Sequence, residues 1–172
     1  DKKSETIIIE ELLKVNPNAV VVRTSWVFSR FGNNFVKTML KIGAEREELA
    51  IVDDQIGCPT YTVDLAECLI LLAEKLKHNG LAERVLHFSN TDSTTWLSFA
   101  QQIFDDAFTI GIIKNKPALS ATTTAAYNLP AARPLHSVLD CSETIKITGQ
   151  KIRHWKVALK EMLDQLYNET KV

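Results

Sequence analysis

Two short apolar, β-branched runs constrain the fold of this chain more than any other feature, because each is followed by a loop of polar and aromatic residues. The runs span residues 19–22 and 49–52. A continuous apolar run of this length is typical of a parallel strand that is buried on both faces of a sheet. Ligands of α/β proteins bind outside the carboxyl ends of such strands, so both loops are expected to reach one crevice.

The side chains of these two loops suit a polar, phosphorylated ligand. Trp26 offers a flat apolar wall with one N–H donor, and Gln55 offers both a donor and an acceptor. Asn33 is predicted to cap a helix over residues 34–42, whose free N–H groups would favour an anion. The alternative is that Trp26 is a core residue and that the other residues only form turns.

The composition fits one soluble globular domain, or one domain and a small part of another. Of the 172 residues 45% are hydrophobic, and the formal net charge of −1 gives no indication of a nucleic-acid-binding surface. Three cysteines without metal-ligand spacing favour a reducing cytoplasm over a disulfide framework. The sequence shows no signal peptide or membrane span, and it opens within a helical pattern, so we expect a piece of a longer protein.

The hydrophobic pattern predicts alternating helices and strands. Helices are predicted over residues 4–15, 34–42, 64–77, 96–108, 142–147 and 155–166, and strands over 19–23, 49–52, 84–89, 117–120 and 137–140. Expected helix caps are Thr94 or Thr95, and Ser142. Asp64 is expected to cap its helix or to complement the helix dipole in the first turn. The first helix, turn and strand fit a βαβ unit whose earlier strand is missing.

Arg133 stands between two prolines, Pro130 and Pro134, in a stiff extended segment. An Arg held in this way is positioned for bidentate contact with a phosphate or a carboxylate. The alternative is an ion pair of Arg133 with an acidic side chain or with the C-terminus of a helix.

Six segments, taken in order, resemble one known family: RTSWVF, GNNFVKTML, DDQIGCPTYTVDLA, TTW, AARPLHSVLD and HWKVALKEML. The family is that of the dTDP-4-dehydrorhamnose reductases, which are extended short-chain dehydrogenases/reductases. The resemblance implies an α/β fold, with the C-terminal part of a Rossmann-like parallel sheet, flanking helices and a small α/β substrate-binding region. Residues 1–60 would belong to the Rossmann-like part, and residues 61–172 mainly to the substrate-binding region.

The resemblance implies a reduction, dependent on NADPH (or NADH), of the 4-keto group of a dTDP-sugar. In the family a Tyr acts as general acid, with a Lys four residues later, because reduction of a ketone by hydride needs a proton donor at the developing alkoxide. Lys3 could be this catalytic Lys, or simply a charged residue in the first turn of a helix. The Tyr and the glycine-rich cofactor loop are not found in this chain, so we expect it to be inactive alone and not to bind NADPH.

The family's substrate-binding positions match a small set of residues in this chain: Trp26, Asn33, Asn34, Gln55, Thr60 and Arg133. No metal ligand set is expected. A second hypothesis is a non-catalytic regulatory or binding protein on the same fold, and a third is a reductase or epimerase of another nucleotide sugar. A sheet without its neighbouring strands would expose an apolar edge, so a homodimer is also considered.

Overall fold

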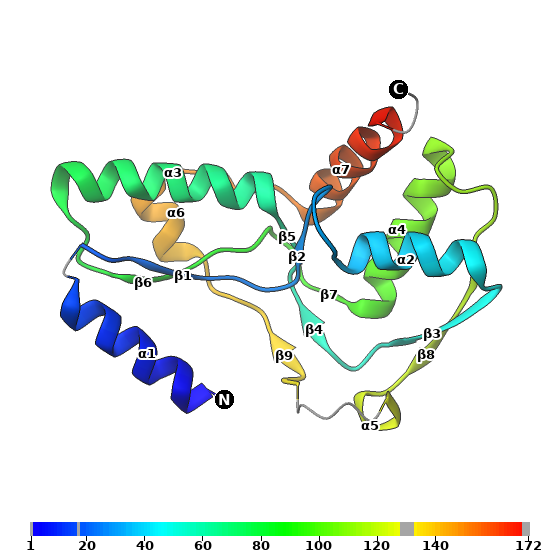
Figure 1. Ribbon diagram of the computed structural model, residues 1–172, viewed down its shortest axis with the longest axis horizontal. Coiled ribbons are helices and arrows are strands. Elements are labelled where there is room, and N and C mark those ends of the chain that lie inside the picture. The colour runs from blue at the N-terminus through cyan, green and yellow to red at the C-terminus, as the bar shows by residue number, and fades with distance from the viewer. Residues whose placement is uncertain (1, 17, 128–132, 170–172) are drawn as a thin grey trace.

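The computed structural model of the protein describes residues 2–16, 18–127 and 133–169, without the side chains of residues 2–5, 78, 79 and 127 (Figure 1). Its helices are α1 (Lys2–Val15), α2 (Phe35–Glu45), α3 (Thr62–Asn79), α4 (Trp96–Ile110), α5 (Thr124–Tyr127), α6 (Ser142–Thr148) and α7 (Trp155–Glu169). Its strands are β1 (Val21–Arg23), β2 (Val27–Phe28), β3 (Glu48–Val52), β4 (Ile56–Gly57), β5 (Thr60–Tyr61), β6 (Val85–His87), β7 (Thr94–Thr95), β8 (Ala118–Thr122) and β9 (His136–Ser137).

Parallel strand pairs dominate the sheet structure, which confirms the predicted α/β fold. β1 pairs with β6, β2 with β5, β3 with β8 and β4 with β9, all in parallel, and β4 also pairs with β7 in the antiparallel sense. Most of these strands have only two or three residues, so the sheet is a set of short pairs. Among the described residues, no helix is long and apolar enough to cross a membrane.

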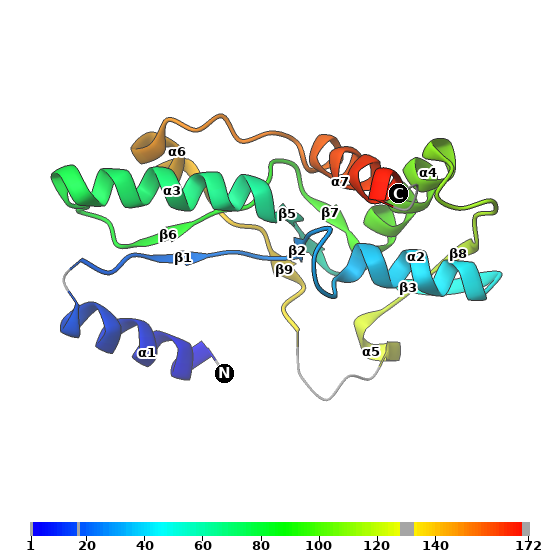
Figure 2. The same cartoon turned by 45° about the horizontal axis from the view of Figure 1, so that its top comes forward.

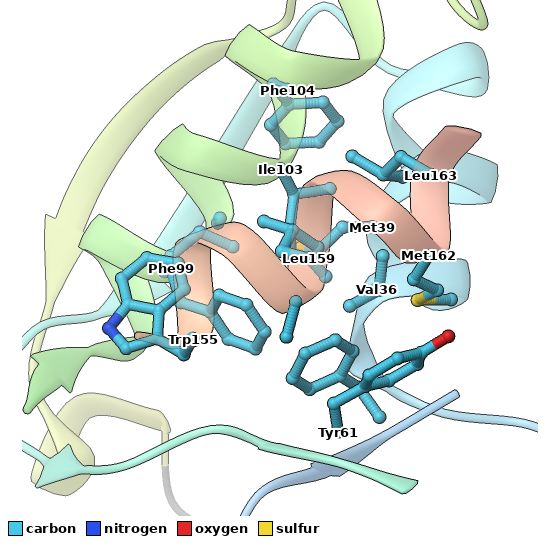
Figure 3. Close-up of a cluster of buried hydrophobic side chains, with 14 of the residues drawn as sticks. Val36, Met39, Tyr61, Phe99, Ile103, Phe104, Trp155, Leu159, Met162 and Leu163 are labelled. Atoms are coloured by element: carbon cyan, nitrogen blue, oxygen red, sulfur yellow. The ribbon is translucent and has the colours of Figure 1, made fainter. Parts of the chain in front are cut away.

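The larger hydrophobic cluster, which we call the helical core, lies between α2, α4 and α7 (Figure 3). Apolar residues at helical spacing on each helix point into it, as the sequence pattern predicts. Figure 3 shows the side chains of α4 and α7 facing one another, with α2 and Tyr61 closing the cluster. Its labelled members are Val36, Met39, Tyr61, Phe99, Ile103, Phe104, Trp155, Leu159, Met162 and Leu163.

A smaller cluster, which we call the sheet cluster, lies between α3 and the β1–β6 pair. It consists of the buried residues Cys68, Leu72, Leu86 and Phe88 with partly buried neighbours such as Val20 and Val22. In both views α3 lies on one side of the β1–β6 pair and α1 lies on the other (Figures 1 and 2). On α3 the Cys68 side chain is fully buried, whereas the neighbouring Leu69 is 46% exposed.

Two predictions of helix caps are wrong. The N-cap of α2 is Asn34 and not Asn33. Ser142 does not cap α6, because the N-cap position belongs to Cys141 and the Ser142 N–H donates to the Asp140 carboxylate instead. Thr95, by contrast, accepts a hydrogen bond from the Ser98 N–H and caps α4 as predicted.

Candidate functional site

The two polar loops meet where β2 pairs with β5, so that the first loop lies directly against the second. The Thr60 N–H donates to the carbonyl oxygen of Trp26 (3.1 Å). The Thr24 hydroxyl lies 3.2 Å from that of Thr60, and the Ser25 hydroxyl donates to the carbonyl oxygen of Cys58 (3.0 Å). Because backbone and side chains both bridge the loops, their relative position is fixed by the fold of this chain.

An aromatic wall, formed by Trp26 and Trp96, lies at this junction. The two indole rings stack with centroids 3.6 Å apart and an interplanar angle of 11°, and Phe35 packs against Trp96 at 4.5 Å. Trp26 has a φ of +49°, a value that residues other than glycine adopt rarely and that is found disproportionately at functional sites. Gly57 permits this arrangement, because a Cβ at that position would lie 2.6 Å from the Trp26 ring.

Gln55 is buried (6% exposed) and supports the aromatic wall by hydrogen bonding. Its Oε1 accepts a hydrogen bond from the Trp96 indole N–H (3.0 Å), and its Nε2 donates to the Thr124 hydroxyl (3.0 Å). The Thr124 hydroxyl in turn donates to the Asp54 carboxylate (2.6 Å), as does the Thr124 backbone N–H (2.9 Å). These hydrogen bonds, that of the hydroxyl foremost, lower the pKa of Asp54.

The two asparagines before α2 have different environments. The Asn34 Oδ1 accepts from the Lys37 N–H (3.2 Å), and its Nδ2 donates to the Ser29 carbonyl oxygen (2.6 Å), so both ends of this amide are engaged within the protein. Asn33 lies exposed in the turn before α2. Of this pair, Asn33 is therefore the residue whose amide is open to solvent.

Arg133 is exposed and follows the undescribed residues 128–132. Two residues later, the Leu135 carbonyl oxygen accepts a hydrogen bond from the Ile56 N–H (2.8 Å), and Ile56 directly follows Gln55. Arg133 is therefore tethered close to the second loop, although no contact of its side chain with the aromatic wall is seen among the described residues.

Lys3 lies in the first turn of α1, and its side chain falls outside the described part of the structure. The structure therefore gives the backbone setting of this residue and no geometry for a catalytic ammonium group.

A buried polar hub, unpredicted from the sequence, holds the second loop from its other end. Asp64 is not the N-cap of α3, but it lies in the first turn of that helix, where a carboxylate complements the helix dipole as predicted. It pairs with Arg153 (2.8 Å), and the Asn90 Nδ2 donates to the same carboxylate (2.5 Å). The Asn90 Oδ1 accepts the N–H of Tyr61 (2.8 Å), which connects the hub to β5. Hydrogen bonds to the carboxylates of Asp64 and Glu161 raise the pKa of the Arg153 guanidinium.

A pocket of about 380 Å³ opens beside the second loop at the carboxyl end of β6, and its lining includes Cys58, Ser89, Asn90 and Cys141. The cysteines are free thiols. Burial raises the pKa of Cys58, and that of Cys68 to about 11, so these two thiols are protonated near neutral pH. Among the residues that the structure describes, no group of three or more His, Cys, Asp or Glu side chains could hold a metal ion.

The glycines do not form a phosphate cradle for a dinucleotide in the described part of the chain. Gly80, Gly111 and Gly149 have positive φ values because they end α3, α4 and α6. A dinucleotide-binding loop needs closely spaced glycines between a strand and a helix. Gly80, Gly111 and Gly149 each end a different helix, so their arrangement does not suit binding of the NADPH phosphates.

The chain is similar to dTDP-4-dehydrorhamnose reductases along most of its length. It is 40% identical over 152 residues to the dTDP-4-dehydrorhamnose reductase of Aggregatibacter actinomycetemcomitans, which covers 88% of this chain and 52% of that protein. The reductase of Escherichia coli K12 is 35% identical over 153 residues, covering 89% and 51%. The chain thus spans about half the length of these relatives.

Solved structures of such reductases share the fold. A dTDP-4-dehydrorhamnose reductase of Clostridium acetobutylicum aligns with a TM-score of 0.78 and 34% identity, covering 92% of this chain and 52% of that one. The enzyme of Bacillus anthracis, solved in complex with NADP, aligns with a TM-score of 0.71 and 36% identity, covering 85% and 48%. The sequence model of one family, described as the RmlD substrate binding domain, matches residues 5–168, and the chain therefore belongs to that family.

Proposed function

We propose that this chain provides the substrate-binding part of a dTDP-4-dehydrorhamnose reductase. The complete enzyme would use NADPH to reduce the 4-keto group of dTDP-4-dehydro-L-rhamnose and so form dTDP-L-rhamnose for cell-surface polysaccharide such as lipopolysaccharide. The observation that carries the proposal is the aromatic wall of Trp26 and Trp96, which lies where the two loops of the family resemblance meet. Reductases that are 33–40% identical to this chain support the choice of substrate.

Five of the six predicted substrate residues have a proposed role that agrees with their surroundings, whereas the amide of Asn34 is engaged as the N-cap of α2. The half-buried Trp26 ring packs against an apolar face of the nucleotide sugar. Gln55 holds the Trp96 ring on which Trp26 stacks, and the fully buried Thr60 holds the Trp26 backbone. The exposed Asn33 and Arg133 are free to turn toward the ligand, with Arg133 directed at the pyrophosphate.

Catalysis would need groups beyond those that this structure describes. Lys3 is the proposed partner of the catalytic Tyr, and the NADPH-binding loop would belong to polypeptide outside this chain. We therefore propose that the chain alone neither binds NADPH nor turns over substrate. The protein would work in the cytoplasm, where its three free thiols stay reduced.

Calorimetric titration of the chain with dTDP, and with UDP for comparison, tests this proposal. We expect dTDP to bind in preference to UDP, and Trp26→Ala to weaken the binding of dTDP by roughly tenfold or more. Arg133→Ala should also weaken it, whereas Phe108→Ala, which removes an exposed ring at the end of α4, should not. Equal affinity for both nucleotides with no effect of Trp26→Ala, or turnover of dTDP-4-dehydrorhamnose by the chain alone, would contradict the proposal.

A further inference from the structure

Two of the three cysteines line the pocket of about 380 Å³ that opens beside the second loop. Cys58 is buried and Cys141 is half-buried, and both are free thiols. The third cysteine, Cys68, is fully buried in the sheet cluster under α3. The pocket thus brings together a thiol that is partly open to solvent and a second thiol that is shielded from it.

The strand pairing holds these two cysteines in one place. β4 pairs with β9 in parallel, in the register Gly57↔Ser137, so the segments that follow the two strands run side by side. Cys58 directly follows β4, and Cys141 comes shortly after β9. Ser89, in the segment that follows β6, lines the same pocket. Three segments that are far apart in the sequence therefore place the two thiols in a common setting.

Ser89 lies against both sulfur atoms. Its side chain is buried (3% exposed), its Oγ lies 3.7 Å from the Cys141 Sγ, and its N–H donates to the same sulfur (3.3 Å). Burial raises the pKa of Cys58, and a hydrogen bond with the Ser89 side chain offsets part of that rise. The backbone of Leu139 also interacts with both thiols. Because the two sulfur atoms share these neighbours, they lie close together in the pocket.

The difference in exposure gives the two thiols different roles. A small oxidant that enters the pocket meets the half-buried Cys141, where the Ser89 N–H is placed to stabilise a thiolate, the form that attacks a peroxide. In redox-sensing pairs, an accessible cysteine is oxidised first and a neighbouring cysteine then resolves it. Cys58 occupies the position of the resolving thiol.

We propose that Cys58 and Cys141 form a redox-active dithiol site, which hydrogen peroxide oxidises to a disulfide. The Cys141 sulfur attacks one peroxide oxygen, the O–O bond breaks, and the released hydroxide leaves as water with the Cys141 proton. The Cys58 sulfur then attacks the sulfenic acid on Cys141, the S–O bond breaks, and the departing hydroxide takes the Cys58 proton as a second water. Two electrons pass from the thiols to the peroxide, and a dithiol reductant reverses the change.

The disulfide acts on the aromatic wall through the backbone of the second loop. The Cys58 carbonyl oxygen accepts a hydrogen bond from the Ser25 hydroxyl (3.0 Å), and the neighbouring Gly57 packs against the Trp26 ring. The sulfur atoms of a disulfide are about 2 Å apart, so its formation draws Cys58 toward Cys141. Oxidation therefore moves the loop on which Trp26 rests and changes the packing of that ring.

Peptide mapping of the complete chain tests the pairing of the thiols. The folded chain is treated with dilute hydrogen peroxide, the remaining thiols are alkylated in denaturant, and the product is digested with trypsin and with a protease that cleaves after acidic residues. Cleavage after Glu67 separates Cys58 from Cys68, so mass spectrometry identifies the partner of Cys141. We expect a peptide pair that joins Cys58 to Cys141, with Cys68 alkylated.

Three variants show whether the pair is specific. Cys58→Ser and Cys141→Ser should each abolish the disulfide, whereas the matched control Cys68→Ala should retain it. Far-ultraviolet circular dichroism checks that each variant is folded, and the mapping of the native chain needs no variant at all. Oxidation of the native chain should alter the near-ultraviolet circular dichroism of the Trp26–Trp96 pair, and dithiothreitol should restore it. Cys141→Ser should show no such change.

A disulfide between Cys68 and Cys141, disulfides only between separate chains, or oxidation of Cys141 without a disulfide would overturn the proposal. A disulfide between Cys58 and Cys141 that leaves the near-ultraviolet signal unchanged would overturn its link to the aromatic wall. Neither dTDP nor NADPH takes part in these measurements, so their outcome is independent of the proposed function.

Discussion

The helical core and the sheet cluster differ in how completely this chain covers them. The helical core is enclosed by α2, α4 and α7, and it supports the wall through Phe35 and Phe99. The sheet cluster is covered by α3 on one side, whereas the helix on its other side, α1, leaves an apolar stripe of Ile8, Leu12 and Val15 exposed. The candidate substrate site thus rests on the more completely covered of the two clusters.

Removal of one aromatic ring from the helical core should have the largest effect on stability. Phe99 is fully buried and contacts Trp155 and Phe28. Phe99→Ala should lower the free energy of unfolding by about 3–5 kcal/mol, because it leaves a cavity. Leu12→Ala in the exposed stripe should change it by less than about 0.5 kcal/mol. Urea denaturation of both variants checks the comparison, and similar losses would show that α1 is packed like the core.

Loss of the buried Asp64–Arg153 ion pair of the hub should lower the free energy of unfolding more than loss of an exposed ion pair. Arg153→Ala leaves the Asp64 carboxylate, whose side chain is 9% exposed, without its partner, and should cost about 3–5 kcal/mol. Arg30→Ala removes an exposed ion pair with Glu169 and should cost at most about 1 kcal/mol. Denaturant titrations at one ionic strength measure both losses. Equal costs would mean that the hub does not hold the second loop.

Substitutions of Gly57 and Gly43 test the packing of the aromatic wall separately from that of the helical core. Gly57→Ala forces a methyl group against Trp26, and Gly43→Ala forces one against Phe104, so each should cost about 1–3 kcal/mol. Gly57→Ala alone should also abolish the near-ultraviolet circular dichroism of the stacked Trp26–Trp96 pair. An unchanged signal in Gly57→Ala would contradict the described packing.

The asparagine pair before α2 offers a smaller, matched test. Asn34→Ala removes the N-cap and should cost about 1 kcal/mol. Asn33→Ala, at an exposed position, should stay within about 0.5 kcal/mol of the native protein. Thermal unfolding distinguishes the two variants. A larger loss of stability in Asn33→Ala than in Asn34→Ala would indicate that Asn33 is the cap.

The smallest expected effect is the pH dependence of Asp54. Its pKa is lowered below 3.8 in the folded state, so its contribution to stability is present above that pH and is lost as the pH falls through the folded pKa. Thr124→Ala removes the hydroxyl donor and should return the carboxyl midpoint toward 3.8. Carbon NMR titration of Asp54 measures this midpoint, and no change would remove Thr124 as the cause.

Local patterns predicted the helices and their order well, because the amphipathic period and residues such as Thr95 act within a few positions. The local patterns failed where the role of a residue depends on a partner that is distant in the sequence. The partner of Asp64 is Arg153, 89 residues further along, and no local signal marks that pair. Strands of two or three residues, such as β2 and β5, are too short for a period to be read.

Only part of the candidate site was predicted, because some of its contacts join residues that are distant in the sequence. The sequence pattern indicated two loops that converge, and Trp26, Gln55 and Thr60 do lie together. Trp96 was missed as a member of the wall, although the TTW segment was singled out, because its stacking with Trp26 depends on packing across 70 residues of chain. The helix over residues 4–15 was predicted correctly, but the hydrophobic pattern alone does not tell whether its apolar side chains are covered.

Amide hydrogen exchange on the chain without ligand tests the central claim most directly. Exchange should be slow in α4 and α7, which enclose the helical core, and in the hydrogen-bonded amides of Thr60 and Tyr61. It should be much faster in α1, whose apolar stripe is uncovered. Equal protection of α1 and α4, or exchange of Thr60 and Tyr61 as fast as that of α1, would contradict a substrate site that this chain completes by itself.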